Sequence, residues 1–161
     1  GVYDADGTFD GTSGAVRFNG SGGSLRLGGA TVTSIGGTFV HGTGTVEYDY
    51  AGNQSVKARN YYNLEIDGTS TSHVKSVINS FTVDNNLTVS TNSAFDVLAR
   101  TITVTGASDI NGILNINGSG TLYCRFKYIQ HSSLNETSNR NILVKADGEN
   151  SPAFTLSFFG F

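Results

Sequence analysis

The sequence predicts an all-β protein, and specifically a parallel β-solenoid (a right-handed β-helix) of about six to eight short coils with little or no helix. Three observations lead to this prediction. Short segments of alternating apolar and polar residues recur from end to end, turn-forming pairs separate them, and similar positions return after about twenty residues. A sandwich or an up-and-down barrel usually has longer strands joined by hairpins. The whole chain, 1–161, is therefore expected to form a single solenoid domain.

The N-terminal part, 1–40, is expected to form less regular coils. Each of its alternating segments places apolar side chains on one face and polar side chains on the other, as a half-buried strand requires. Pairs containing Gly lie between these segments and suit tight turns. The expected strands are AVRF (15–18), SLRL (24–27), ATVTSI (30–35) and TFV (38–40).

Regular coils are expected over 41–145. The spacing supports them, because eighteen residues separate Val46 from Leu64 and nineteen separate Leu64 from Val83. Inward Val, Ile, Leu and Phe side chains then stack on their counterparts in the next coil. The expected strands are TVEYDY (45–50), YNLEID (62–67), SFTV (80–83), NLTV (86–89), AFDVL (94–98), TITV (101–104), ILNI (113–116), TLYCRF (121–126) and NILV (141–144).

The C-terminal part, 146–161, contains an apolar strand, AFTLSF (153–158), and no charged residue after Glu149. A solenoid end normally carries a polar cap, so an apolar end favours pairing with a second copy of the chain. The predicted assembly interface comprises Phe154, Leu156, Phe158, Phe159 and Phe161, with Val2 and Tyr3 as their partners. Two alternatives stay open, namely a last coil that folds back onto its own core and an end cut from a longer solenoid.

Charge and hydropathy exclude two classes of partner. Charged residues are 14% of the chain, the formal net charge is −3, and the basic residues are scattered, so we expect no nucleic-acid binding. No apolar run approaches the roughly 20 residues of a transmembrane helix, so none is expected. Cys124 is the single cysteine, which excludes an internal disulfide, and its alternation with Leu122 and Phe126 predicts a buried side chain.

Two groups of acidic residues are candidate sites. Asp4, Asp6 and Asp10 lie in a Gly-containing segment and are a candidate calcium site, although the spacing of an EF-hand loop is not met. Glu47, Asp49, Glu65 and Asp67 share one outer face if their two strands stack. Paired carboxylates catalyse glycoside hydrolysis, but like charges in register also occur as solvated edges. We expect no enzyme, and no cofactor other than calcium.

Aromatic side chains on the outer surface would indicate sugar binding. By strand parity Tyr48 and Tyr50 point inward with Val46, and Tyr62 points inward with Leu64. Only Tyr61 is then outward, which is too few rings for a sugar-binding platform. His41, His73 and His131 lack the spacing of zinc ligands.

The stretch GTVEYDYAGNQSV…NYYNLEIDG, followed by SFTVDNNLTVSTNS, TITVTG and FKYIQHSSLNETSN, resembles the degenerate repeats of bacterial surface proteins and adhesins of the filamentous-haemagglutinin kind. The resemblance covers about 44–145 and lies in composition and spacing. It implies a right-handed β-helix and an exported protein.

The sequence therefore predicts an exported, non-enzymatic structural or adhesive solenoid, extracellular or at the cell surface, which self-associates head to tail into a filament or fibre. The lack of any Met, even at position 1, favours a removed leader or an excised fragment. Surface glycans are a further expected partner. The alternative is a carbohydrate-binding or polysaccharide-cleaving β-helix, such as a segment of a phage fibre or tailspike.

Overall fold

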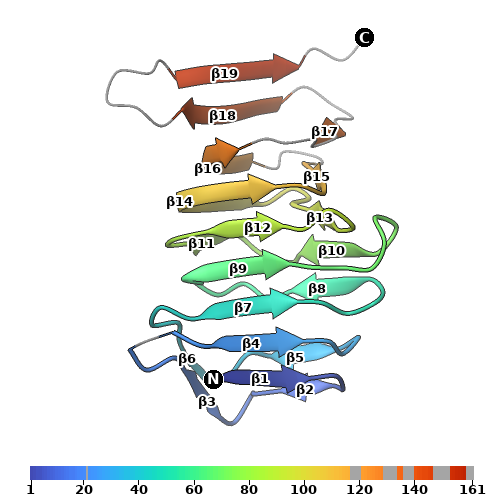
Figure 1. Ribbon diagram of the computed structural model, residues 1–161, viewed down its shortest axis with the longest axis vertical. Helices are drawn as coiled ribbons and strands as arrows, with labels where there is room; N and C mark the ends of the chain where they lie inside the picture. The colour runs from blue at the N-terminus through green and yellow to red at the C-terminus, as the bar shows by residue number, and fades with distance from the viewer. Residues whose placement is uncertain (21, 117–120, 129–133, 136–139, 147–152, 159–161) are drawn as a thin grey trace.

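The computed structural model is a parallel β-solenoid of about six turns (Figure 1), which confirms the predicted fold class. It describes residues 1–20, 22–116, 121–128, 134–135, 140–146 and 153–158, with side chains described up to Tyr123. The described residues form strands and turns and no helix. Each coil takes 18 to 23 residues, as shown by the pairing of Thr45 with Asn63 and of Leu64 with Leu87.

One side of the solenoid is a continuous sheet, here called the long sheet, which has ten strands. Its neighbours pair in parallel except for the last two, β18 and β19, which are antiparallel. The strands in order are β1 (Val2–Ala5), β4 (Ser24–Leu27), β7 (Thr45–Tyr48), β9 (Asn63–Ile66), β12 (Leu87–Val89), β14 (Thr101–Ile110), β16 (Thr121–Tyr128), β18 (Arg140–Ala146) and β19 (Ala153–Phe158), and β11 (Phe81–Val83) joins β14.

The second side is built from two separate sheets. The first two coils contribute β2 (Phe9–Asp10) and β5 (Val32–Ser34), which pair only with each other. The later coils contribute a five-stranded parallel sheet, called the second sheet. Its strands are β8 (Gln54–Val56), β10 (Val74–Val77), β13 (Ala94–Asp96), β15 (Ile113–Asn115) and β17 (Leu134–Asn135).

The third side is also interrupted. In the first two coils β3 (Ala15–Arg17) pairs with β6 (Thr38–Val40). Further along, β11 pairs with the first half of β14, and the second half of β14 pairs with β12 of the long sheet. A single strand, β14, therefore turns the corner between two sides, and Gly106 lies at that corner.

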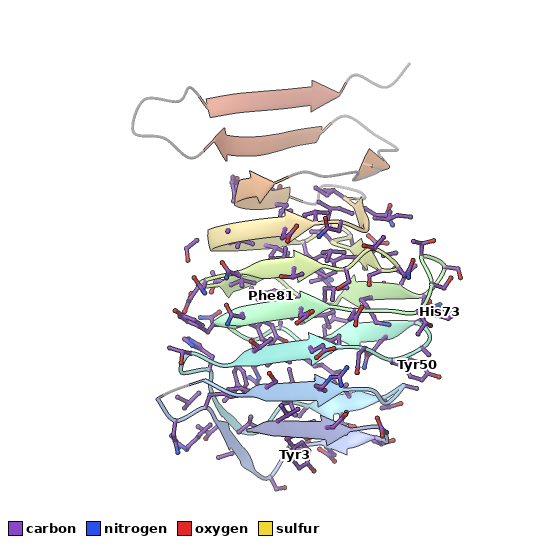
Figure 2. The ribbon with its side chains drawn as sticks, viewed as in Figure 1. Tyr3, Tyr50, His73 and Phe81 are labelled. Atoms are coloured by element: carbon purple, nitrogen blue, oxygen red, sulfur yellow. The ribbon has the colours of Figure 1, made fainter. Side chains whose placement is uncertain are left out.

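The core is a set of columns of apolar side chains along the axis, as the alternation predicted. Leu25, Val46, Leu64 and Leu87 form one column in register, and all are at most 3% exposed. Figure 2 shows Phe81 within the stack and Tyr3 at its N-terminal end. Polar ladders join the coils outside: Asn63 Nδ2 donates to Thr45 Oγ1 (3.3 Å) and Asn85 Nδ2 donates to Asn63 Oδ1 (2.9 Å).

The C-terminal strand differs from a further parallel coil. β19 lies antiparallel to β18, with Val144 opposite Phe154 and Ile142 opposite Leu156. A tight return of the chain gives an antiparallel pair, whereas a parallel pair needs a longer crossover around the rod. β19 is thus the last strand of the long sheet.

Candidate functional site

The outer face of the long sheet carries an acidic surface, which we call the acidic face. The strand register stacks Asp4, Arg26, Glu47 and Glu65 in one column. Asp6, Asp49 and Asp67 lie two positions after Asp4, Glu47 and Glu65, just past the ends of their strands, and stand beside that column. Six carboxylates thus face one guanidinium among the described residues of the first four coils. The predicted sharing of one face by Glu47 and Glu65 is confirmed by their direct pairing.

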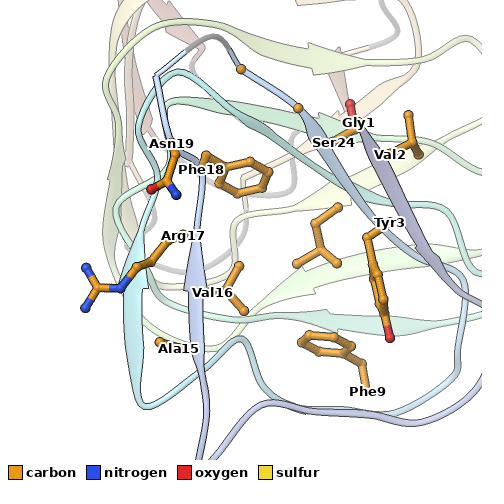
Figure 3. Close-up of a pocket in the computed structure, with 13 residues that line it drawn as sticks. Gly1, Val2, Tyr3, Phe9, Ala15, Val16, Arg17, Phe18, Asn19 and Ser24 are labelled. Carbon is orange, nitrogen blue, oxygen red and sulfur yellow. The ribbon is translucent and has the colours of Figure 1, made fainter.

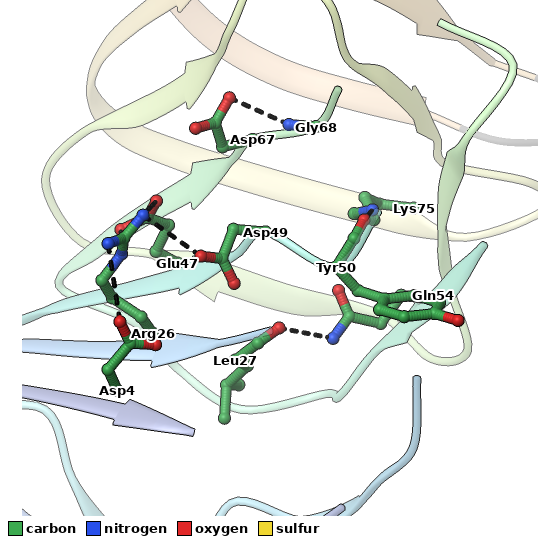
Figure 4. A network of polar contacts seen from close by, with 10 residues as sticks. All are labelled: Asp4, Arg26, Leu27, Glu47, Asp49, Tyr50, Gln54, Asp67, Gly68 and Lys75. Atoms are coloured by element: carbon green, nitrogen blue, oxygen red, sulfur yellow. Dashed lines mark hydrogen bonds and ion pairs between the residues drawn. The ribbon is translucent and has the colours of Figure 1, made fainter. Parts of the chain in front are cut away.

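Arg26 holds the acidic face together (Figure 4). Its Nε and Nη2 donate to both carboxylate oxygens of Glu47, at 2.8 and 3.0 Å. Nη2 also lies 3.1 Å from Asp49 Oδ2, and Nη1 lies 3.6 Å from Asp4 Oδ2. A two-pronged pair of this kind fixes the geometry of both partners. Since the Arg26 side chain is 38% exposed, solvent weakens each of these ion pairs.

Two carboxyl groups of the acidic face are disfavoured as anions. Burial raises the pKa of Glu65, and the charges of Glu47 and Asp67 raise it further. Burial likewise raises the pKa of Asp49, with Glu47 as the next cause, although Arg26 opposes the shift. Arg26 also opposes the shift of the Glu65 pKa, as the smallest of its causes, but its ion pairs are with Asp4, Glu47 and Asp49, so the repulsion between Glu65 and Glu47 of the preceding coil is less compensated.

Opposite effects on stability are therefore expected from two matched substitutions in this column. Glu65→Gln should stabilise the protein at pH 7 by about 0.5 kcal/mol, because it removes a like-charge pair directly in register. Glu47→Gln should destabilise it by about 1 kcal/mol, because Arg26 loses its two-pronged partner. Urea unfolding at pH 7 measures both, and an equal change of the same sign would contradict the assigned roles.

The three aspartates of the predicted calcium site are not brought together. Asp4 faces Arg26, and Asp10 accepts hydrogen bonds from the backbone and hydroxyl of Thr12, which lower its pKa. Asp6 Oδ1 instead lies 3.0 Å from the point where a side chain on Gly28 would begin, and Asp49 Oδ1 lies 3.3 Å from it. Among the described residues no three His, Cys, Asp or Glu side chains are grouped as metal ligands. Calcium requires six to eight oxygens.

The corner between the long sheet and the second side contains two buried polar side chains that sequence reasoning missed (Figure 4). Gln54 Nε2 donates to the carbonyls of Leu27 and Gly29, at 2.7 and 2.8 Å. Lys75 Nζ, one coil further, donates to the carbonyls of Tyr50 and Gly52. Lys75 is fully buried, and this burial lowers its pKa. Their role is to satisfy corner carbonyls, since buried acceptors without donors are costly.

Tyr48 is buried as parity predicted, but three other tyrosines are placed differently from the prediction. Tyr61, expected outside, is fully buried, and its hydroxyl interacts with that of Tyr48 (3.1 Å). Tyr62, expected inside, is half-buried and stacks on His41 with ring centres 6.2 Å apart. Tyr50, also expected inside, is half-buried beside Lys75. Parity fails here because the chain turns a corner next to each of these residues.

The first coil carries two exposed apolar side chains beside a hollow. Val2 and Tyr3 are 69% and 63% exposed, although Tyr3 belongs to the inward column of Leu25. Figure 3 shows the hollow beside them, about 470 Å³ in volume. Its apolar lining comes from the first two coils and includes Val2, Tyr3, Phe9, Val16, Phe18 and Leu25. Tyr3 meets Phe9 edge to face, with ring centres 6.3 Å apart.

The C-terminal members of the predicted interface are only partly described. Phe154, Leu156 and Phe158 belong to β19, and Phe159 and Phe161 lie outside the described residues, as does the Cys124 side chain. No described helix is long and apolar enough to span a membrane.

Comparison of the chain with protein-family models, with curated proteins and with solved structures gives no match in any of the three.

Proposed function

We propose that this chain is an exported structural or adhesive element, placed outside the cell or at its surface, which associates end to end with further copies of itself. A stack of coils joined by a continuous sheet and outer polar ladders suits a stiff rod. The observation that carries the proposal is the apolar hollow lined by the first two coils. Exposed Val2 and Tyr3 border this hollow, and β1 is the end strand of the long sheet.

The chemistry of that end favours another β-strand as its partner. An end strand presents unpaired N–H and C=O groups, and an added strand satisfies them. Apolar side chains that stand in the register of a core column are stabilised when a further layer covers them. The occupant that we propose is the C-terminal end of a second copy, which offers the end strand β19.

The strand directions define how two copies would pair. β1 runs in the same direction as β18, whereas β19 runs in the opposite direction. In a head-to-tail stack with aligned rods, β1 therefore pairs antiparallel with β19 of the next copy. Such contacts are heterologous and repeat without closing, which gives a filament. Phe154, Leu156 and Phe158 then lie in the strand that meets Val2 and Tyr3.

Tyr3→Lys is expected to weaken self-association by at least about 30-fold, because it places a charge in an aromatic contact at the centre of the interface. Tyr123→Lys is the matched control, since Tyr123 is also exposed (45%) but lies in β16, away from β1. Sedimentation over a range of concentrations gives the association constant, and electron microscopy shows whether filaments form. A wild-type chain that stays monomeric would contradict the proposal, and so would equal effects of the two variants.

A second candidate function is carbohydrate binding or cleavage at the acidic face. The observation that favours it is Arg26, a basic residue that contacts Asp4, Glu47 and Asp49 at once. The excess of carboxylates would repel an acidic polymer, so the ligand class would be a neutral or amino sugar polymer. The carboxyl groups with raised pKa, Asp49 and Glu65, would be its proton donors.

A glycan array with the wild-type chain and Arg26→Gln tests this candidate. Binding that is lost in Arg26→Gln and kept in Arg100→Gln, a variant of an exposed arginine, would support it. Binding that survives Arg26→Gln, or no binding to any neutral or amino glycan, would exclude the acidic face as a sugar site.

A further inference from the structure

The junction between the second and third coils is the place where two of the three sides lose their pairing. The sheets of β2 with β5 and of β3 with β6 both end at the second coil. The second sheet begins only at β8, and in the third coil the third side has no strand, only a bridge from Tyr61 to Val83 in the fourth coil. Among the described strands only the pair β4 and β7 crosses the junction.

The junction between the fourth and fifth coils, in contrast, is paired on every side. Between the fourth and fifth coils, β9 pairs with β12, β10 pairs with β13, and β11 pairs with β14. The backbone hydrogen bonds of three strands thus join these two coils. The junction between the second and third coils has one strand pair in place of three.

Side chains of the third coil replace part of the missing pairing. Gln54 Nε2 reaches back to the carbonyls of Leu27 and Gly29, and Arg59 Nη2 donates to the carbonyl of Gly36 at 2.8 Å. On the third side, Tyr61 meets Phe39 edge to face, with ring centres 5.9 Å apart. Each of these contacts depends on one side chain and not on a row of backbone hydrogen bonds. Fixing such a side chain costs conformational entropy.

Ion pairs also cross this junction. Arg26 in the second coil pairs with Glu47 and Asp49 in the third coil, and His41 Nε2 in the second coil lies 3.1 Å from Asp84 Oδ2 in the fourth. The side chains of Arg26, His41 and Asp84 are 38%, 31% and 43% exposed, and pairs that are open to solvent contribute little to stability. These contacts therefore do not make up for two missing strand pairs.

We propose that the first two coils, residues 1–20 and 22–44, open from the rest of the solenoid as one cooperative unit. The stability of a stacked-coil protein is close to a sum over neighbouring interfaces, so the chain parts first where an interface is weakest. Opening exposes the layer of Val46, Tyr48, Val56 and Tyr61 together with the free edge of β8. Release of the first two coils therefore uncovers a new end face, which the third coil forms. This inference does not depend on self-association.

Native-state hydrogen exchange of the full chain over a series of denaturant concentrations tests the proposal. We expect amides of β4, β5 and β6 to show protection at least about tenfold lower than amides of β9, β10 and β11, with a step between the second and third coils. The first and second coils should share one opening free energy and one denaturant dependence. A gradual rise of protection from coil to coil, as simple fraying gives, would overturn the proposal, and so would equal protection on both sides of the junction.

Arg59→Met gives an independent test of the junction. Loss of the bond to the Gly36 carbonyl should speed exchange in β4, β5 and β6 by about tenfold and leave β12 and β13 unchanged. Arg100→Met is the matched control, because Arg100 is exposed. An equal acceleration of all strands by Arg59→Met, or none, would show that the junction is not a separate opening site.

Discussion

Above pH 10 the protein is expected to lose stability steeply, by about 1.4 kcal/mol per pH unit for each of two buried tyrosines. The residues are Tyr48 and Tyr61, both fully buried. Burial raises the pKa of each, and for Tyr61 the neighbouring Tyr48 raises it further. In the unfolded chain tyrosine ionises near pH 10, so above that pH the unfolded state releases protons that the folded state keeps. Stability then falls as pH rises.

Closed hydrogen bonding explains why these hydroxyls keep their protons. The Lys57 carbonyl can only accept, so the Tyr61 hydroxyl donates to it. Tyr61 has then used its proton, and Tyr48 donates to Tyr61 (3.1 Å) while accepting from the Lys57 N–H (2.9 Å). Loss of either proton would break this ring inside the core. The ring also satisfies the N–H and C=O groups of Lys57, which lies just outside β8.

Chemical unfolding between pH 8 and pH 12 measures the expected slope, and absorbance of tyrosinate reports ionisation directly. Tyr61→Phe should halve the alkaline slope and cost about 1–3 kcal/mol at pH 7, because the Lys57 carbonyl loses its donor. Tyr62→Phe should change neither the alkaline slope nor the stability at pH 7, since the Tyr62 side chain is only half-buried. A wild-type chain whose stability is flat from pH 10 to pH 12 would show that the two hydroxyls ionise freely.

Lys75 should act in the opposite direction at lower pH. Its folded-state pKa is lowered, so as pH rises toward the usual lysine value of 10.5 the unfolded chain holds a proton that the folded chain has lost. Stability therefore rises with pH below that value. Above it the lysine contributes no further change, and the tyrosine slope alone remains.

Gly106→Ala is expected to destabilise the protein by about 3 kcal/mol, which corresponds to a fall in Tm of about 10 °C. A Cβ on Gly106 would lie 2.1 Å from the Asn85 carbonyl oxygen and 2.6 Å from its carbonyl carbon. Both atoms belong to the backbone of the preceding coil, so no side-chain rotation relieves the overlap. Either the two coils separate locally or the corner of β14 shifts.

Gly14→Ala is the control for this substitution. The nearest atom to an added Cβ there is the Gly11 carbonyl oxygen at 3.8 Å, an ordinary contact. Its stability should stay within about 0.5 kcal/mol of the wild type. Thermal unfolding followed by circular dichroism compares the two, and similar Tm values would contradict the close stacking of coils at this corner.

Two strands that the sequence failed to predict, β8 and β10, share a physical cause. Gln54 and Lys75 occupy inward positions of β8 and β10, and the pairing of Lys75 with Gln54 and Phe95 places all three in one column. A polar residue at an inward position hides the apolar alternation on which strand prediction depends. Their burial is tolerated because each meets two carbonyls of the preceding corner, and the sequence of a single strand contains no record of that contact.

The candidate site, too, could be predicted from the sequence only in part. The shared face of Glu47, Asp49, Glu65 and Asp67 followed from strand spacing, because a parallel stack places residues one coil apart side by side. The position of Arg26 among them did not, since its partners come from the coils on either side of it. The expected gathering of Asp4, Asp6 and Asp10 failed because Asp4 and Asp10 lie in strands of two different sides, with a corner between them.

The sequence by itself determined that this protein is a stack of short parallel coils, because alternation within strands and a return near twenty residues fix both the inward face and the direction of pairing. Only the tertiary structure decided what happens at the corners and the junctions. There Tyr61 turns inward, Gln54 and Lys75 bind the carbonyls of the preceding coil, and β19 reverses direction. The physical reason is that the burial of a side chain at a corner depends on its contacts with the neighbouring coil. Within a strand, burial follows from the alternation of side chains along the strand itself.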